Sequence, residues 1–195
     1  VKLRQWAPKL QAAGCYDRAS PYDRNRKRDP LDGRVGREQA LEDKLIERYE
    51  VEVKDCQSHI SALRKIKMTE EIEAMRRAND VGVAAIIEGM RATKPGVSEW
   101  ELDSLMSFVQ RRLGAAGPAY EAIVGTGANA LILHYISNHE VCKDGELLLV
   151  DFAPEVDHFI TDITRTWPVN GKFTKRQAEI YDCVYEAQEA AIAAV

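Results

Sequence analysis

Two short apolar segments, each carrying one aspartate, constrain the fold of this chain most. The first is the apolar run 147–150, which Asp151 follows directly. The second covers residues 159–167 and has Asp162 near its start. A short continuous apolar run such as 147–150 is typical of a strand that is buried on both faces. The sequence therefore predicts two strands, joined by a hairpin at residues 154–158, with one carboxylate on each strand.

The two carboxylates face each other if the hairpin tip is Val156-Asp157. In that register Asp151 lies directly opposite Asp162, with Cβ atoms ~4.5–5.5 Å apart on one face of the sheet. Two unit charges at that separation repel by about 3 kcal/mol at an effective dielectric constant of ~20. A shared proton, solvent exposure or a divalent cation could offset this repulsion. The spacing alone leaves these three explanations open, together with a pair of unrelated surface acids.

His134 is the third candidate site residue. It lies in the apolar segment Ile132-Leu133-His134-Tyr135, seventeen residues before Asp151. A single histidine in an apolar run is most often a satisfied core residue. Its functional interpretation is a hydrogen-bond donor or proton carrier beside the carboxylates, because histidine titrates closest to neutral pH. The other three histidines are expected at the surface: His59, His139 and His158.

Helical signals surround the predicted strands. A charged helix is expected over residues 38–50, and an amphipathic helix is expected from a cap at Thr69 up to Pro95. Ser98 and Glu101 form a capping box for a third helix, and Thr174 with Gln177 forms another near the end of the chain. Residues 120–124 and 131–135 are expected to be extended. The order of two helices, several strands and a last helix predicts an α+β fold with an antiparallel sheet.

The composition is that of a globular protein. The chain has 195 residues, of which 45% are hydrophobic and 30% are charged, so disordered, collagen-like and coiled-coil classes are disfavoured. No run approaches the ~18 apolar residues that a membrane span needs, and the first residues lack the apolar core of a signal peptide. The four cysteines, at positions 15, 56, 142 and 183, show no paired spacing. We therefore expect reduced thiols, a cytoplasmic protein and no membrane partner.

Charge is unevenly distributed along the chain. Residues 1–67 carry a net charge of +5 and residues 68–195 a net charge of −9. The basic run 24–28 is a candidate nucleic-acid or targeting patch, but Asp23 and Asp29 flank it and favour a solvated linker. We expect no nucleic-acid partner. Because the chain starts with Val1 and stops at Val195 within a helical pattern, we also expect it to be part of a longer protein.

From about Leu63 to Val195 the chain resembles the pita-bread metallopeptidases. It is most similar to the Xaa-Pro aminopeptidases (aminopeptidase P) and the related proline dipeptidases. The resemblance rests on residues 63–67 before Glu70-Glu71-Ile72, on residues 123–129 and 132–135, and most distinctively on Asp162-Ile163-Thr164-Arg165-Thr166-Trp167-Pro168-Val169-Asn170-Gly171-Lys172-Phe173.

The resemblance implies a role for each candidate residue. Asp151 and Asp162 match the first two metal-binding aspartates of the family, and His134 matches the active-site histidine. Two divalent metal ions, commonly manganese, are implied as cofactors. The family's other ligands, one histidine and two glutamates, belong to the second half of its catalytic domain. Residues 63–195 then form the first half of a pita-bread domain, and residues 1–62 form a linker and the remnant of a preceding domain.

The implied function is hydrolysis of the N-terminal peptide bond that precedes proline. Its substrates would be peptides with proline at the second position. The full-length protein would be a homo-oligomer, and the chain as given would be inactive alone. A proline dipeptidase of the same fold is an alternative. A non-catalytic pita-bread binding module and a creatinase-like, metal-independent hydrolase are further alternatives, although neither explains why the aspartate pair is present.

Overall fold

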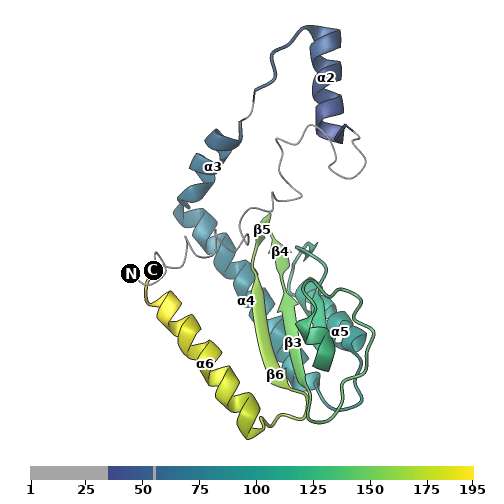
Figure 1. Cartoon of the computed structure of the whole chain (residues 1–195). Helices are drawn as coiled ribbons and strands as arrows, with labels where there is room; N and C mark the ends of the chain where they lie inside the picture. The colour runs from purple at the N-terminus through teal and green to yellow at the C-terminus, as the bar shows by residue number, and fades with distance from the viewer. Residues whose placement is uncertain (1–34, 55) are drawn as a thin grey trace, which may run out of the picture. The chain divides into compact units, whose positions relative to one another are not determined.

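The structure is a computed structural model that describes residues 35–54 and 56–195. The basic run 24–28 and Cys15 lie outside the described residues, and Cys56, Cys142 and Cys183 carry free thiols. The chain divides into two compact units, Val1–Arg64 and Lys65–Val195. The first contains α2 (Arg37–Tyr49), as predicted, and most of α3 (Gln57–Lys65) (Figure 1). Within the described part of the chain, no helix is long and apolar enough to cross a bilayer.

The second unit combines three helices with two small antiparallel sheets, which confirms the predicted α+β class. Strands β2, β3 and β6 form one sheet in the order β2-β3-β6, and β1, β4 and β5 form the other in the order β1-β4-β5. The elements are α4 (Thr69–Ala92), α5 (Glu99–Arg112), β1 (Gly117–Pro118), β2 (Ile123–Thr126), the 3-10 helix η1 (Gly127–Leu131), β3 (Leu147–Phe152), β4 (Pro154–Val156), β5 (Phe159–Ile160), β6 (Ile163–Pro168) and α6 (Lys175–Ile192).

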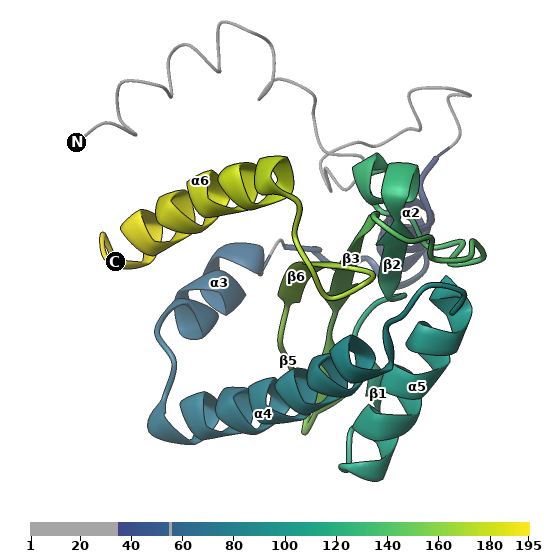
Figure 2. The ribbon, with the colours of Figure 1, turned by 90° about the horizontal axis from the view of Figure 1, so that it is seen from below.

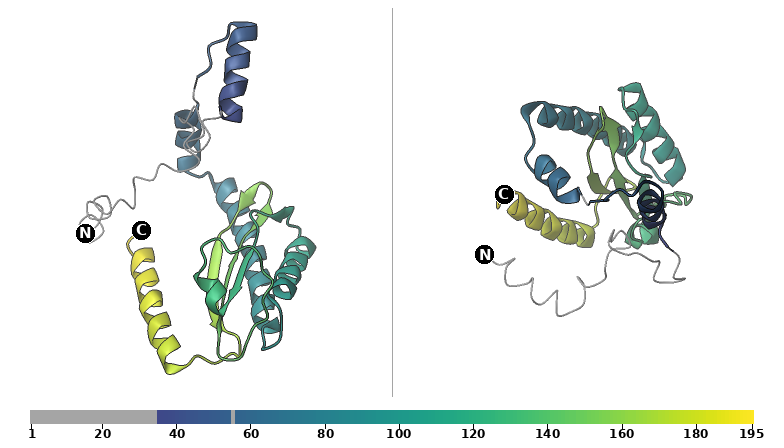
Figure 3. Two further views of the ribbon diagram at one scale, coloured as in Figure 1. Left: turned by 45° about the vertical axis from the view of Figure 1, so that its right-hand side comes forward. Right: turned by 90° about the horizontal axis from the view of Figure 1, so that it is seen from above.

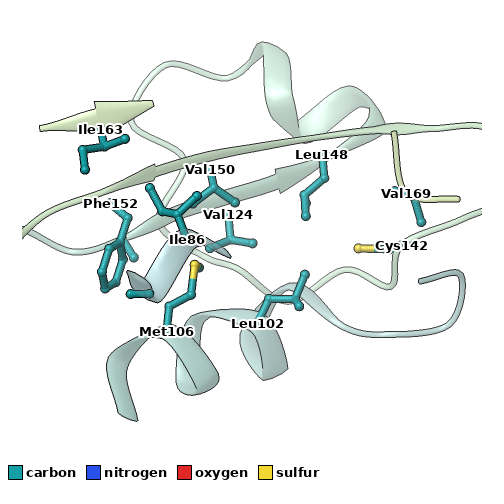
Figure 4. Close-up of a cluster of buried hydrophobic side chains, with 12 residues drawn as sticks. Ile86, Leu102, Met106, Val124, Cys142, Leu148, Val150, Phe152, Ile163 and Val169 are labelled. Carbon is teal, nitrogen blue, oxygen red and sulfur yellow. The ribbon is translucent and has the colours of Figure 1, made fainter. Parts of the chain in front are cut away.

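Helices α4 and α5 pack against each other and cover one face of the β2-β3-β6 sheet, whereas α6 lies on the other side (Figures 2 and 3). Burial along β3 alternates, so that Leu148, Val150 and Phe152 are buried while their neighbours are half-buried. The prediction that this strand is fully covered on both faces was therefore wrong. Figure 4 shows the buried side chains of β3 meeting Leu102 and Met106 of α5.

The predicted helix caps are largely confirmed. Ser98 Oγ accepts a hydrogen bond from Glu101 N at 3.3 Å, and Glu101 Oε2 accepts one from Ser98 N at 2.8 Å. Thr174 and Gln177 make the same reciprocal pair at the start of α6. The predicted start of α4 was wrong by one residue, because Met68 is the cap and Thr69 is already helical.

The predicted hairpin register was wrong by two residues. Asp151 pairs with Thr164 instead of Asp162, and the tip is Asp157-His158. Both tip residues have positive φ, 52° and 65°, as a two-residue hairpin turn of the favoured type requires. Asp and His tolerate that conformation, whereas the β-branched Val156 does not. Because the error is an even number of residues, both aspartates still lie on the same face of the sheet.

Two predicted extended segments also differ from the structure. The strand expected at 120–124 corresponds to β2, which begins three residues later than predicted. Leu131 ends η1, and residues 132–135 form a loop. Leu131 and Leu133 are 87% and 85% exposed, and Tyr135 is buried. The long second strand is split into β5 and β6, and Asp162 lies in the gap between them.

Candidate functional site

The two aspartates converge on the hydroxyl group of Tyr120. Asp151 is half-buried in β3, and Asp162 is exposed directly before β6. Tyr120 Oη lies 3.1 Å from Asp162 Oδ1 and closer to Asp151 Oδ1, to which it donates its single proton. Since one hydroxyl group contacts both carboxylates, the two side chains lie close together on the sheet face opposite α4 and α5. The predicted proximity of the two aspartates is therefore confirmed. Their geometry differs from the prediction, because the aspartates lie diagonally to each other instead of directly opposite.

Burial of Tyr120 and its hydrogen bond to Asp151 raise the pKa of the phenol well above its usual range. The phenol therefore keeps its proton at neutral pH and donates it to Asp151, while its oxygen also lies within hydrogen-bonding distance of Asp162. A donated O–H offsets part of the repulsion between the two aspartates. Exposure of Asp162 offsets more of it, because water screens the charge. Of the explanations that the sequence left open, solvent exposure thus applies to Asp162.

The donor set fits part of a divalent-cation site. Carboxylate oxygens are the ligands that Mn²⁺, Mg²⁺ and Ca²⁺ prefer, and Asp151 and Asp162 present oxygens to one common point. Among residues 35–54 and 56–195, no group of three or more His, Cys, Asp or Glu side chains could hold a metal ion. The described residues thus provide two ligands, and a complete site needs further donors.

Asp162 is accessible from two grooves. One, of about 640 Å³, lies between β6 and α6, and the other, of about 650 Å³, lies between α4 and the β5–β6 connection. The first is lined by Leu147, Asp162, Thr164, Arg165, Thr166, Arg176, Gln177, Ile180, Tyr181, Val184, Tyr185 and Gln188. A ligand in either groove could reach the Asp162 carboxylate directly.

His134 does not contact the aspartates. It is exposed, has a φ of 55°, and lies in the loop after η1. In the described part of the chain, no hydrogen bond or ion pair joins it to Asp151 or Asp162. Its catalytic role stays a prediction. The remaining histidines are at the surface, as predicted: His59, His139 and His158.

Sequence reasoning missed a buried acidic residue, Glu99. Its side chain is 0% exposed, and the Glu99 carboxylate accepts hydrogen bonds from the residues that flank the His134 loop. Oε1 accepts from Thr126 N at 2.7 Å and from Asn129 Nδ2 at 3.1 Å. Oε2 accepts from Tyr135 Oη at 2.7 Å and from Glu140 N at 3.0 Å. Neither Glu99 nor Tyr120 stands out by spacing, because their partners are distant in the sequence.

Comparison with known proteins identifies the family. A profile of metallopeptidase family M24 matches residues 73–195, more than half of the chain. The chain belongs to the M24 metallopeptidases. This confirms the resemblance drawn from the residues around Asp162, and both aspartates lie within the matched residues.

Within this family the chain is similar to Xaa-Pro aminopeptidases. It is 41% identical over 138 residues to Xaa-Pro aminopeptidase of Escherichia coli, covering 71% of this chain and 31% of that protein. It is 42% identical over 141 residues to human Xaa-Pro aminopeptidase 3, covering 72% of this chain and 28% of the relative. The chain therefore spans about a third of the length of these relatives.

Solved structures confirm the pita-bread fold. A substitution variant of Escherichia coli aminopeptidase P in complex with substrate matches with a TM-score of 0.70 and 36% identity, covering 81% of this chain and 38% of that one. Another solved form of that enzyme is zinc-substituted and in complex with product, with a TM-score of 0.69 and 39% identity, covering 78% of this chain and 36% of that one. The M24 chain described here thus shares both sequence and fold with aminopeptidase P.

Proposed function

We propose that this M24 protein is a metal-dependent aminopeptidase that removes an N-terminal residue preceding proline. The observation that carries the proposal is the convergence of Asp151 and Asp162 on one point of the open sheet face. The similarity to proteins named Xaa-Pro aminopeptidase supports the choice of substrate. Peptides with proline at the second position are the proposed substrates.

Asp151 and Asp162 would hold two divalent cations, with manganese as the proposed metal and further ligands from outside the described residues. Bound there, the cations would polarise the carbonyl group of the scissile bond and lower the pKa of a water molecule. Tyr120 donates its proton to Asp151, and its hydroxyl oxygen also contacts Asp162. His134 would donate a hydrogen bond or carry a proton at the reacting carbonyl.

Substitution of each aspartate tests this proposal in the protein at its full natural length. Asp151→Asn and Asp162→Asn keep the side-chain shape but remove the charge that binds a cation. We expect bound manganese, measured by elemental analysis, to fall, and turnover of a Xaa-Pro peptide to drop by about a hundredfold or more. Asp157→Asn is the matched control, because Asp157 is an exposed aspartate at the hairpin tip that pairs with Arg77.

Unchanged turnover and metal content in both variants would reject the proposed site. The same assay separates aminopeptidase from proline dipeptidase activity, since a dipeptidase cleaves Xaa-Pro dipeptides and leaves longer peptides intact. We also propose that the full-length protein is a cytoplasmic homo-oligomer. Light scattering after size-exclusion chromatography measures its subunit number.

A non-catalytic binding module is the second candidate function. It is favoured by the Tyr120 hydroxyl group, which gives both carboxylates a protein partner. Isothermal titration of the metal-stripped protein with Mn²⁺ separates the two candidates. Micromolar or tighter binding that Asp162→Asn abolishes supports the peptidase, whereas no binding to the unsubstituted protein supports the module.

A further inference from the structure

We propose that Glu99 is a positioning residue, which sets the conformation of the loop that presents His134. This inference builds on the proposed function, in which His134 acts on the substrate. Glu99 is the first residue of α5, directly after the cap residue Ser98. The cap uses Glu101, so that the Glu99 side chain is free to point into the protein. The N-terminal end of the helix dipole also favours a negative charge at this position.

The Glu99 carboxylate joins both ends of the segment that contains His134. The backbone N–H of Thr126, at the end of β2, donates to Glu99 Oε1. The backbone N–H of Glu140, which follows the loop, donates to Glu99 Oε2. The backbone N–H of Glu99 also donates to the carbonyl oxygen of Glu140 at 2.9 Å. A single buried side chain therefore fixes residues 126 and 140 relative to the start of α5.

The middle of the loop is held through Tyr135. Of residues 131–136, Tyr135 is the one that is buried, at 7% exposure. Its hydroxyl group donates to Glu99 Oε2 at 2.7 Å and accepts from Asn129 Nδ2 at 2.9 Å. His134 directly precedes Tyr135 and makes no contact with the aspartates. The position of His134 therefore depends on the hydrogen bonds that Tyr135 makes with Glu99 and Asn129.

Glutamine cannot replace Glu99 without loss. Each carboxylate oxygen accepts one backbone N–H group, from Thr126 on one side and from Glu140 on the other. An amide has one oxygen and one NH₂ group. In either orientation of the glutamine, its NH₂ group would face one of these backbone N–H donors. The tyrosine hydroxyl group and the Asn129 amide can turn, but a backbone N–H cannot, so that one end of the loop loses its anchor.

The test compares Glu99→Gln with Glu101→Gln in the protein at its full natural length. Both changes remove one carboxylate charge from the first turn of α5, but Glu101 contacts Ser98 and not the loop. For Glu99→Gln we expect kcat for a Xaa-Pro peptide to fall about ten- to a hundredfold, with KM and bound metal within about threefold. For Glu101→Gln we expect kcat within about twofold of the unsubstituted protein.

A double-mutant cycle with His134→Ala distinguishes positioning from general damage. If Glu99 acts through His134, then Glu99→Gln lowers kcat no further once His134 is absent. An equal loss of kcat in both backgrounds would overturn the proposal. Tyr135→Phe removes the hydroxyl group that donates to Glu99 and leaves the Glu99 carboxylate in place. If Glu99→Gln does not fold, Tyr135→Phe takes its place in the double-mutant cycle with His134→Ala. The expected loss of kcat is then smaller but again absent without His134.

Hydrogen exchange makes the test independent of peptidase activity. We expect Glu99→Gln to speed amide exchange at Thr126 or Glu140 at least tenfold, while exchange in β3 is unchanged. If the protein has no peptidase activity but this exchange result is obtained, the proposed function fails and the anchoring role of Glu99 stands. If exchange in the segment 126–140 is unchanged, the inference about Glu99 is wrong whatever the activity.

Discussion

Gly82 of α4 packs against the residues on both sides of Asp162, and we predict that Gly82→Ala destabilises the protein. A Cβ atom at this position would lie 2.9 Å from Ile163 Cδ1, 3.0 Å from Thr161 Cγ2 and 3.2 Å from Pro154 Cδ. Thr161 and Ile163 are the direct neighbours of Asp162. The added methyl group thus requires the side chains of Thr161 and Ile163, on either side of this proposed metal ligand, to shift.

Two opposing effects set the magnitude. Alanine is a better helix former than glycine by about 1 kcal/mol in the interior of a helix. Overpacking of a buried contact costs about 1–3 kcal/mol, and the proline ring near Gly82 cannot turn away. We therefore expect Gly82→Ala to lower the free energy of unfolding by about 1 kcal/mol. The affinity for Mn²⁺ should fall as well, because Asp162 moves.

Gly89→Ala is the matched control on the same face of α4. Its Cβ atom would lie 2.8 Å from Met106 Sδ and 3.2 Å from Met106 Cγ. A methionine side chain adapts to such a contact at little cost, so that the helix propensity of alanine about offsets the repacking. Urea unfolding followed by circular dichroism at 25 °C measures both variants. The reasoning is refuted if Gly82→Ala is at least as stable as the unsubstituted protein, or if Gly89→Ala loses more.

Three further predictions concern the helix cap at Ser98, the hairpin tip at His158 and the buried tyrosine Tyr135. Ser98→Ala removes the acceptor for the Glu101 N–H and should cost about 1 kcal/mol in urea unfolding; no loss would contradict the cap. His158→Gly relieves a residue with φ of 65° and should raise the melting temperature by about 1–3 °C; a lower value would contradict the turn. Burial and the Glu99 hydrogen bond raise the pKa of Tyr135 above its unfolded value of about 10. The folded state thus retains a proton that the unfolded chain releases, so stability should fall as the pH rises above about 10. Tyr135→Phe should flatten that decline in pH-dependent urea unfolding, and an unchanged slope would contradict the assignment.

Local sequence signals were sufficient for several elements. The capping boxes at Ser98 and Thr174 were predicted because both partners lie within four residues of each other. The strand at residues 147–150 follows from an apolar run with clear boundaries, and β3 continues through Asp151 to Phe152. The distinctive run that starts at Asp162 was enough to predict the family, which comparison with known proteins confirms.

The site geometry was predicted only in part. That Asp151 and Asp162 share a face of the sheet follows from strand periodicity, and an error of two residues in the register left it unchanged. The register itself depends on the turn at Asp157-His158, where two residues other than glycine adopt positive φ. Sequence patterns favour glycine or asparagine for such turns, so that this pair gave no usable signal.

The amino-acid sequence by itself determined the capping boxes of α5 and α6, the strand that carries Asp151 and the family to which the chain belongs, because these depend on short-range order. Only the tertiary structure decided that Tyr120 joins the two carboxylates and that Glu99 anchors the loop of His134. Those contacts join residues 27 to 42 positions apart. The packing of α5 against the strands determines which residues make these contacts. No local sequence pattern specifies that packing.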